Sequence, residues 1–230
     1  MGEAKRKKAK IAGTTDDPAF QKSVFVEAFE QTRQLLSDPA IETLEALRLT
    51  YRACNNELDR AAAVHGAAGK AECVPGCDSC CHQMVMCSPF EVLAIARFLL
   101  ETKSPPEIAA IEERLSRLAP LPLDPAARLD RRHPCALLEN GRCTAYDERP
   151  AACRTMLSAS RAACERSLAS KSGTIPYLAD AAKIAAIVQL AIDHATATRT
   201  GRSTERVELS RALHIALRSE EHTSELQSRG

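Results

Sequence analysis

The chain has 230 residues, enough for one domain with a sizeable core. Hydrophobic residues make up 45% of it, aromatic residues only 3%, and Trp is absent, a composition typical of helical rather than sheet-rich proteins. With 31 basic and 30 acidic residues, the charge balance gives no argument for nucleic-acid binding. We therefore predict a mainly α fold without a nucleic-acid partner. The ten cysteines are the unusual feature.

The chain begins with a polar, basic segment. Lys5-Arg6-Lys7-Lys8 has no interleaved aromatic residues and no apolar run follows it. Residues 1–20 are therefore predicted to be a disordered basic leader rather than a signal peptide or a binding arm. Apolar runs elsewhere are too short to span a membrane. We expect a cytoplasmic protein without membrane contact, in which dense thiols indicate a metal site rather than a disulfide framework.

Residues 21–66 are predicted to form N-terminal helices, one from Phe20 to about Leu36 and one from Pro39 to about His65. One apolar stripe runs along the second helix and contains Leu44, Leu47, Tyr51, Cys54 and Leu58. Because Cys54 lies on this stripe, we interpret its thiol as a core group and leave it out of the metal site.

Residues 67–170 are predicted to form a cysteine-cluster domain. Its first block, Cys73-Val-Pro-Gly-Cys77-Asp-Ser-Cys80-Cys81, places four thiols within nine residues. Pro75-Gly76 and Asp78-Ser79 supply tight turns that would aim sulfur atoms at one point, as a metal knuckle requires. In an extended segment the adjacent Cys80 and Cys81 would diverge. They would then serve two metal ions, or one metal ion and another group.

The spacing of Cys73, Cys77 and Cys80 also matches the three-cysteine loop of radical S-adenosylmethionine enzymes. That fold requires a β/α barrel around the loop, and its usual aromatic residue before the third cysteine is Ser79 here. The helical surroundings and the adjacent Cys81 favour the simpler metal-binding interpretation.

Two capping boxes follow the first block. Ser88-Pro89-Phe90-Glu91 predicts a helix from about Pro89 to Glu101, and Ser104-Pro105-Pro106-Glu107 predicts another. The core-facing positions of the second helix are Ile108, Ile111, Leu115 and Leu118. Cys87, just before the first box, is interpreted as a core or staple residue.

A proline-rich linker, Pro120–Pro125, leads to the second cysteine block. Asn140-Gly141 is the strongest two-residue turn signal and predicts a short β-hairpin in which Leu138 pairs with Cys143. Cys135 and Cys143 would then point to opposite faces unless a bulge or a bend near Pro134 intervenes. A short helix carrying Cys153 and Arg154 comes next, and Cys164 is the last cysteine.

Residues 171–217 are predicted to form C-terminal helices, one from Thr174 to about Thr198 and one from about Ser203. The following stretch, Arg218–Ser228, reads RSEEHTSELQS, which a common short-read sequencing adapter can encode. We therefore interpret residues 218–230 as adapter-derived and not native, and expect the natural sequence to continue differently after Leu217.

The two cysteine blocks together resemble the zinc- or iron-chelating cysteine-cluster family, often called YkgJ-type or CxxCxxCC proteins. The resemblance covers about Cys73–Cys164. It rests on the four cysteines of the first block and on Pro89–Glu91, Pro134-Cys135, Gly141-Arg142-Cys143, Tyr146, Arg149-Pro150 and Cys153-Arg154.

Eight thiols are the predicted metal ligands, and together they would satisfy two tetrahedral sites or one four-iron cluster with several thiols left over. The expected cofactor is therefore zinc or iron, including a 4Fe-4S cluster, and the sequence does not choose between them. Arg149 and Arg154 would offset thiolate charge or form ion pairs on a helix surface. His82 and His133 are alternative ligands. The eight thiols are those of Cys73, Cys77, Cys80, Cys81, Cys135, Cys143, Cys153 and Cys164.

Three classes of function remain open. The first is a metal-binding module with a structural or accessory role, whose helices offer a surface to a protein partner. The second is an iron–sulfur enzyme or subunit for redox chemistry or protein modification; related domains occur in flagellin lysine methylases. The third is a thiol-transfer protein with exposed reactive cysteines. Because no phosphate loop, Ser/His/Asp arrangement or carboxylate pair stands out, whether the chain is an enzyme stays open.

Overall fold

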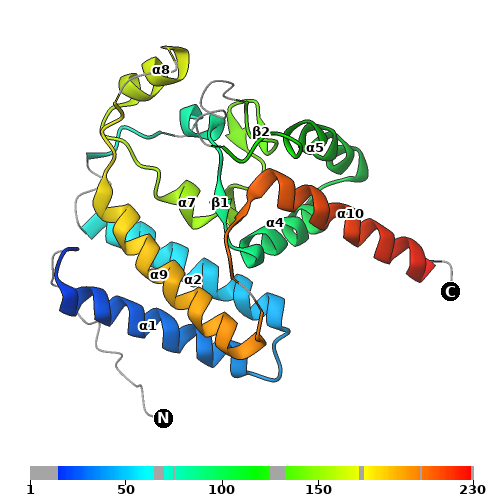
Figure 1. Cartoon of the computed structure of the whole chain (residues 1–230), viewed down its shortest axis with the longest axis horizontal. Coiled ribbons are helices and arrows are strands. Elements are labelled where there is room, and N and C mark those ends of the chain that lie inside the picture. Colours follow the sequence, from blue (N-terminus) through cyan, green and yellow to red (C-terminus); the bar gives the residue numbers. More distant parts are fainter. Residues whose placement is uncertain are drawn as a thin grey trace, which may run out of the picture.

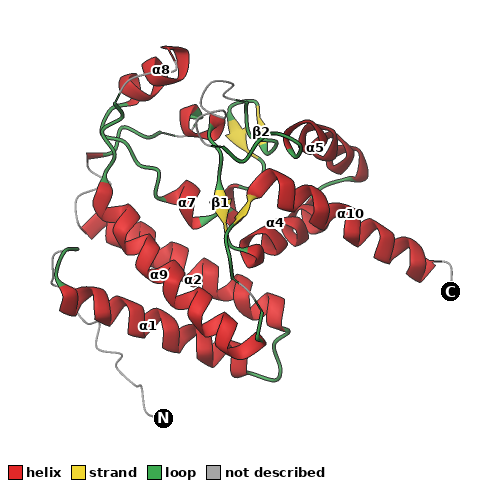
Figure 2. Cartoon of the chain, in the orientation of Figure 1, coloured by secondary structure: helices red, strands yellow, loops and turns green. Residues whose placement is uncertain are grey.

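The computed structural model describes residues 15–64, 70–74, 76–124, 133–170, 174–202 and 204–228, with the backbone alone at 54–64, 181 and 220–228. The basic run of the predicted leader and the side chain of Cys54 lie outside the described part. The described chain is mainly helical, as predicted, and Figure 2 shows how little of it is strand.

The elements, in chain order, are α1 (Pro18–Ser37), α2 (Thr43–Val64), the 3-10 helix η1 (Ser79–His82), β1 (Met86–Cys87), α4 (Pro89–Thr102), α5 (Pro105–Leu118), β2 (Leu138–Glu139), β3 (Arg142–Cys143), the 3-10 helix η2 (Tyr146–Glu148), α7 (Ala151–Arg154), α8 (Arg161–Ser170), α9 (Ala179–Thr200), β4 (Val207–Glu208) and α10 (Leu209–Ser228). In the described part of the chain, every helix is too short or too polar to span a lipid bilayer.

Helices α1, α2 and α9 pack side by side as a three-helix bundle (Figure 1). Its apolar core includes Leu47, Tyr51 and Ile192, all nearly inaccessible to solvent. Helix α1 begins where Asp17 accepts a hydrogen bond from the backbone N–H of Ala19 at 2.9 Å. The bundle therefore has its own hydrophobic core.

A second core lies between α4, α5 and α10 and the β2–β3 hairpin. Both predicted capping boxes are present, at Ser88 with Glu91 and at Ser104 with Glu107. The core-facing residues predicted for α5 are all buried: Ile108, Ile111, Leu115 and Leu118. Helix α10 thus packs on the cysteine side of the molecule, whereas α9 belongs to the bundle, although both were grouped as C-terminal helices.

Some predicted helix boundaries were wrong. Helix α2 begins at Thr43 instead of Pro39, because Asp38 ends α1 and organises a turn through the N–H groups of Ala40 and Ile41. Helix α9 begins at Ala179 instead of Thr174, because the preceding segment is extended and Tyr177 forms a β-bridge with Ser158.

The start of the last helix was also missed, and strands β1 and β4 and helix α8 were not predicted. Strand β4 pairs antiparallel with β1, matching Val207 to Cys87, so α10 begins at Leu209 and not near Ser203. Helix α8, which carries Cys164, had no predicted counterpart. Helix α10 continues through residues 218–228, and its C-terminal end extends away from the body (Figure 1).

Candidate metal centre

The first cysteine block folds as two successive turns. Gly76 has a φ of 86°, which favours glycine, and the Cys77 N–H donates to the Val74 carbonyl at 2.9 Å. The 3-10 helix η1 follows, with the Cys81 N–H donating to the Asp78 carbonyl at 2.8 Å. The predicted turns are therefore present between the first two cysteines and before the last two.

The prediction that the Cys80 and Cys81 side chains diverge assumed an extended segment, but both residues lie in the 3-10 helix η1. Interaction between the two thiols lowers the pKa of Cys80 to about 7 and raises that of Cys81 well above its ordinary value. That the two thiols serve different metal ions stays a prediction.

The second block is the predicted hairpin with a bend at its mouth. Asn140 and Gly141 both have positive φ, 50° and 72°, and Leu138 pairs with Cys143 as predicted. Cys135 lies outside the two-residue strand β2, because the chain turns there and the Leu138 N–H donates to the Cys135 carbonyl at 2.9 Å. The bend lies where the sequence required one if Cys135 and Cys143 were to face the same metal.

The two blocks meet at the backbone. The N–H of Cys135 donates to the carbonyl of Cys81 at 2.7 Å, across 54 positions of sequence. Cys135 and Cys143 both pack against the second core while remaining half-buried. This contact brings η1 and the hairpin mouth together.

Helix α7 carries Cys153 and is fixed through the residues before it. Glu148 is buried, and its Oε1 pairs with Arg48 Nε at 3.3 Å and Arg52 Nε at 3.2 Å, both from α2. The Cys153 N–H donates to the Pro150 carbonyl at 2.9 Å. The bundle thus anchors the segment that leads into this cysteine.

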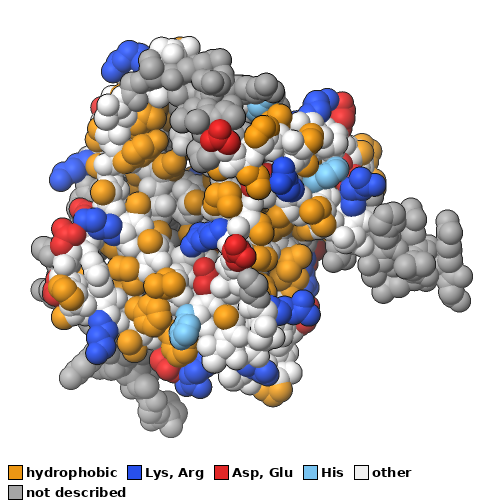
Figure 3. Space-filling view, in the orientation of Figure 1, with side chains coloured by type: hydrophobic (Ala, Val, Ile, Leu, Met, Phe, Trp, Pro, Cys, Tyr) orange, Lys and Arg blue, Asp and Glu red, His pale blue; other side chains and the backbone are white. Residues whose placement is uncertain are grey.

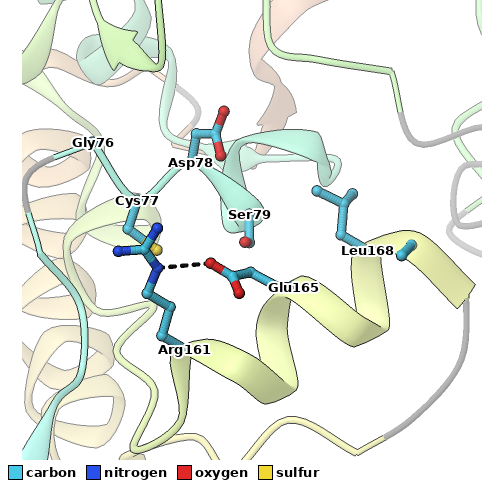
Figure 4. A pocket seen from close by; sticks show the side chains of 8 residues that line it. Gly76, Cys77, Asp78, Ser79, Arg161, Glu165 and Leu168 are labelled. Atoms are coloured by element: carbon cyan, nitrogen blue, oxygen red, sulfur yellow. Dashed lines mark hydrogen bonds and ion pairs between the residues drawn. The ribbon is translucent and has the colours of Figure 1, made fainter.

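Cys73 and Cys77 precede η1 in the chain, and Cys164 lies in α8, which packs against η1. The backbone N–H of Ser158 lies 3.5 Å from Cys73 Sγ. Glu72 ties the start of α8 to the first block, because its Oε2 accepts the Arg161 N–H at 2.8 Å. A cavity of about 270 Å³ opens here, lined by Cys77, Arg161 and Glu165 among others (Figure 4).

We group the eight candidate thiols into two sets according to which of them affect one another's pKa, and Cys80 affects thiols in both sets. In the inner set, burial raises the pKa of Cys135 to about 11, and burial followed by neighbouring thiolate charge raises that of Cys153. In the outer set, burial raises the Cys77 pKa, and its thiol also interacts with those of Cys73, Cys80 and Cys164. The inner set is Cys80, Cys81, Cys135, Cys143 and Cys153; the outer set is Cys73, Cys77 and Cys164.

Arg149 and Arg154 face the inner set. The positive charge of Arg149 favours ionisation of the Cys80, Cys143 and Cys153 thiols, and Arg154 favours that of Cys143, although burial still keeps the pKa of Cys143 raised. Arg149 stacks 3.6 Å above the ring of Tyr146, and Arg154 donates to the carbonyl of Asp147 at 2.5 Å. The predicted offset of thiolate charge agrees with these effects on the pKa, and the choice between the two predicted roles stays open.

The remaining predicted candidates have other surroundings. The described cysteines are free thiols, and Cys87 is completely buried in β1, consistent with the core role given to it. His82 Nδ1 lies 3.2 Å from the Asp78 carbonyl, and His133 is exposed.

The sequence did not indicate that Glu91 and Glu148 hold the segments of the site in place. The capping box could have drawn attention to Glu91. No sequence pattern marked Glu148.

The donor chemistry fits zinc or iron. The candidate ligands are thiols, which as thiolates suit both metals, and a bound cation would reverse the rise in pKa that burial and mutual repulsion produce. In the described residues, no group of three or more His, Cys, Asp or Glu side chains is arranged to hold a metal ion. The type and burial of these side chains support a zinc or iron site. Their arrangement in this structure does not.

Comparison with known proteins agrees with the cysteine pattern. Residues 72–172 match the model of the CxxCxxCC family, described as "Putative zinc- or iron-chelating domain". Searches of curated proteins and of solved structures found no match to the chain.

Proposed function

Because residues 72–172 are a CxxCxxCC domain, we propose that this protein binds zinc or iron through its clustered cysteines in a structural or accessory role. The proposed ligands are the inner set and the outer set. The metal, when bound, would cross-link segments that are distant in sequence.

The contact between the two cysteine blocks carries this proposal. The Cys135 N–H to Cys81 carbonyl bond of 2.7 Å places η1 against the hairpin mouth, and Cys81 and Cys135 interact electrostatically. Half-buried thiols that repel one another when ionised are unfavourable as free thiolates, and a divalent cation relieves that repulsion. Arg149 would neutralise part of the excess negative charge of a site with four or more thiolates.

A structural or accessory role agrees with the small size of the cavity beside Cys77. Its volume of about 270 Å³ falls below the roughly 300–1,000 Å³ of small-molecule sites. On the face shown in Figure 3, basic and acidic side chains are scattered among apolar ones instead of collecting into a patch of one sign. We place the protein in the cytoplasm, where its thiols would stay reduced.

The cavity also supports a second candidate, an iron–sulfur enzyme or subunit for redox chemistry or protein modification. Its position beside Cys77 would leave one side of an outer-set metal or cluster open to another molecule. Arg161 and Glu165, paired at 2.7 Å, border that opening (Figure 4). This candidate requires a cluster with visible absorbance and redox activity.

Anaerobic purification followed by metal analysis and a visible spectrum tests both candidates. We expect at least one tightly held zinc or iron per chain. A colourless zinc protein would support the structural role, and a brown, redox-active protein would support the second candidate. A metal-free protein in which all ten cysteines titrate freely under native conditions would overturn both.

Ligand substitutions test the division of the cysteines. We expect Cys143→Ser in the inner set and Cys77→Ser in the outer set to lower both bound metal and stability, because each removes a proposed ligand. The controls are Cys54→Ser and Cys87→Ser, at positions interpreted as core. These should retain the metal, with Cys54→Ser reducing the unfolding free energy by roughly 1 kcal/mol. Equal metal loss in all four variants would show that the division is wrong.

A further inference from the structure

Glu91 is a buried carboxylate that bonds to two separate parts of the chain. It is 4% exposed, at the third position of α4. Its Oε2 accepts the N–H of Ser88 at 2.9 Å, which is the ordinary capping-box bond. Its Oε1 accepts the N–H of Ala151 at 2.8 Å, from a residue 60 positions away. The second bond has no counterpart in a local capping box.

Ala151 is the first residue of α7, the helix that carries Cys153. This helix spans only four residues, and Pro150, which precedes it, supplies no side-chain cap. A single helical turn is unstable alone, and its first N–H groups need an acceptor. Glu91 supplies that acceptor, with a negative charge that favours the N-terminal end of a helix.

The carboxylate is held in place from the bundle side as well. Tyr51 of α2 and Ser88, the cap of α4, share a hydrogen bond of 2.7 Å between their hydroxyl groups. Gln189 of α9 donates to the Tyr51 hydroxyl at 2.8 Å. Because Ser88 is fixed by these contacts and Glu91 bonds to Ser88, the carboxylate has little freedom to leave α7.

The second capping box of the chain provides an internal comparison. Glu107 occupies the same position in α5, and its Oε2 accepts from both the N–H and the hydroxyl of Ser104, at 2.8 and 2.7 Å. Its side chain is 51% exposed, and its other oxygen meets Lys103 of the same segment. The two glutamates therefore share a motif and differ in whether they reach another element.

We propose that Glu91 is a positioning residue for Cys153: by capping α7 it fixes where this thiol lies relative to the rest of the inner set. This inference uses the ligand set proposed above, but it concerns a contact that exists whether or not metal is bound. Its test therefore reads the Cys153 thiol directly.

Glu91→Gln is the first variant. The amide keeps the size of the side chain but replaces one carboxylate oxygen with an NH2 donor, so either Ser88 or Ala151 loses the oxygen that accepts from it. The full-length protein is treated with a limiting amount of iodoacetamide, and alkylation of each cysteine is followed by mass spectrometry. We expect alkylation of Cys153 to rise about tenfold, more than that of Cys135 or Cys143, because losing a bond to a charged acceptor favours local opening. Glu107→Gln should leave Cys153 unchanged.

Ala151→Pro breaks the same bond from the other side and leaves the capping box of α4 intact. Proline is tolerated at the first position of a helix, and Pro150 already has the extended backbone, with ψ of 151°, that a following proline requires. The Cys153-specific rise should recur in this variant, which also keeps the inference testable if Glu91→Gln does not fold.

The alternatives give distinct results. A uniform rise in all inner-set cysteines would mean that Glu91 supports general stability only, and an unchanged Cys153 in both variants would overturn the inference. Metal analysis of the same samples separates the two proposals: a metal-free protein with the Cys153-specific effect refutes the proposed function and retains the role of Glu91.

Discussion

In the three-helix bundle, helices of 20 to 22 residues pack along their lengths around an apolar core. The inner-set cysteines, in contrast, lie on elements of two to four residues or in loops: η1, β3, α7 and the turn at Cys135. Helices and hairpins this short are not stable by themselves. Packing along the helices can therefore account for the stability of the bundle. The cysteine segments depend on contacts from neighbouring elements and, we propose, on metal.

Metal removal should produce the largest difference in stability between the cysteine segments and the bundle. A chelator is expected to destabilise the cysteine segments by several kcal/mol, because the binding free energy of a structural metal is folding free energy. Hydrogen exchange followed by mass spectrometry should show faster exchange at residues 76–87 and 133–157, with α1 and α9 still protected. Equal loss of protection in the bundle would remove the distinction between the regions.

Leu47→Ala should affect the bundle and spare the metal. Leu47 is 1% exposed, and truncating a buried leucine leaves a cavity that reduces the unfolding free energy by about 2–5 kcal/mol. Urea unfolding measures this loss, and metal analysis should show unchanged stoichiometry. The control Leu49→Ala, at a 36% exposed position of the same helix, should have a much smaller effect. Metal loss in Leu47→Ala would indicate that the bundle and the metal site fold as one unit.

Glu148→Gln tests the connection between the regions. Glu148 is 3% exposed at its side chain and joins α2 to the segment before α7 through Arg48 and Arg52. Neutralising it should reduce the unfolding free energy by about 1–3 kcal/mol, because hydrogen bonds to a buried charged group are lost. Glu45→Gln is the matched control, since Glu45 also pairs with Arg48 but is 33% exposed. Urea unfolding that shows equal effects in both variants would argue against an anchoring role.

The pH dependence at Asp193 should be the smallest effect. Asp193 of α9 faces Arg206, just before β4, at 3.8 Å, and burial raises the pKa of its carboxyl. Between the unfolded and folded pKa values the folded state holds a proton that the unfolded state has lost, so the contribution of Asp193 to stability falls as pH rises through that range. Relative to Asp193→Asn, the unmodified protein should therefore lose stability as pH rises above about 4, the ordinary pKa of an aspartate. Thermal melting measures the difference, and parallel curves would contradict it.

Several features followed from the sequence because their causes are local. A capping box acts within four residues, so Ser88 and Ser104 marked the starts of α4 and α5 correctly. Asn140-Gly141 supplies the positive φ angles of its turn, so the register of Leu138 with Cys143 was also predicted. The cysteine spacing likewise identified the family of residues 72–172.

The tertiary structure decided what depends on partners distant in the chain. Pairing of Cys87 with Val207 set the start of α10, and no periodicity near Ser203 could indicate it. The bond from Ala151 to Glu91 gave a capping residue its second contact 60 positions away. Sequence patterns report which face of an element is apolar or which residues suit a turn. They do not report which distant element supplies the partner of a buried polar group, because that depends on how the whole chain packs.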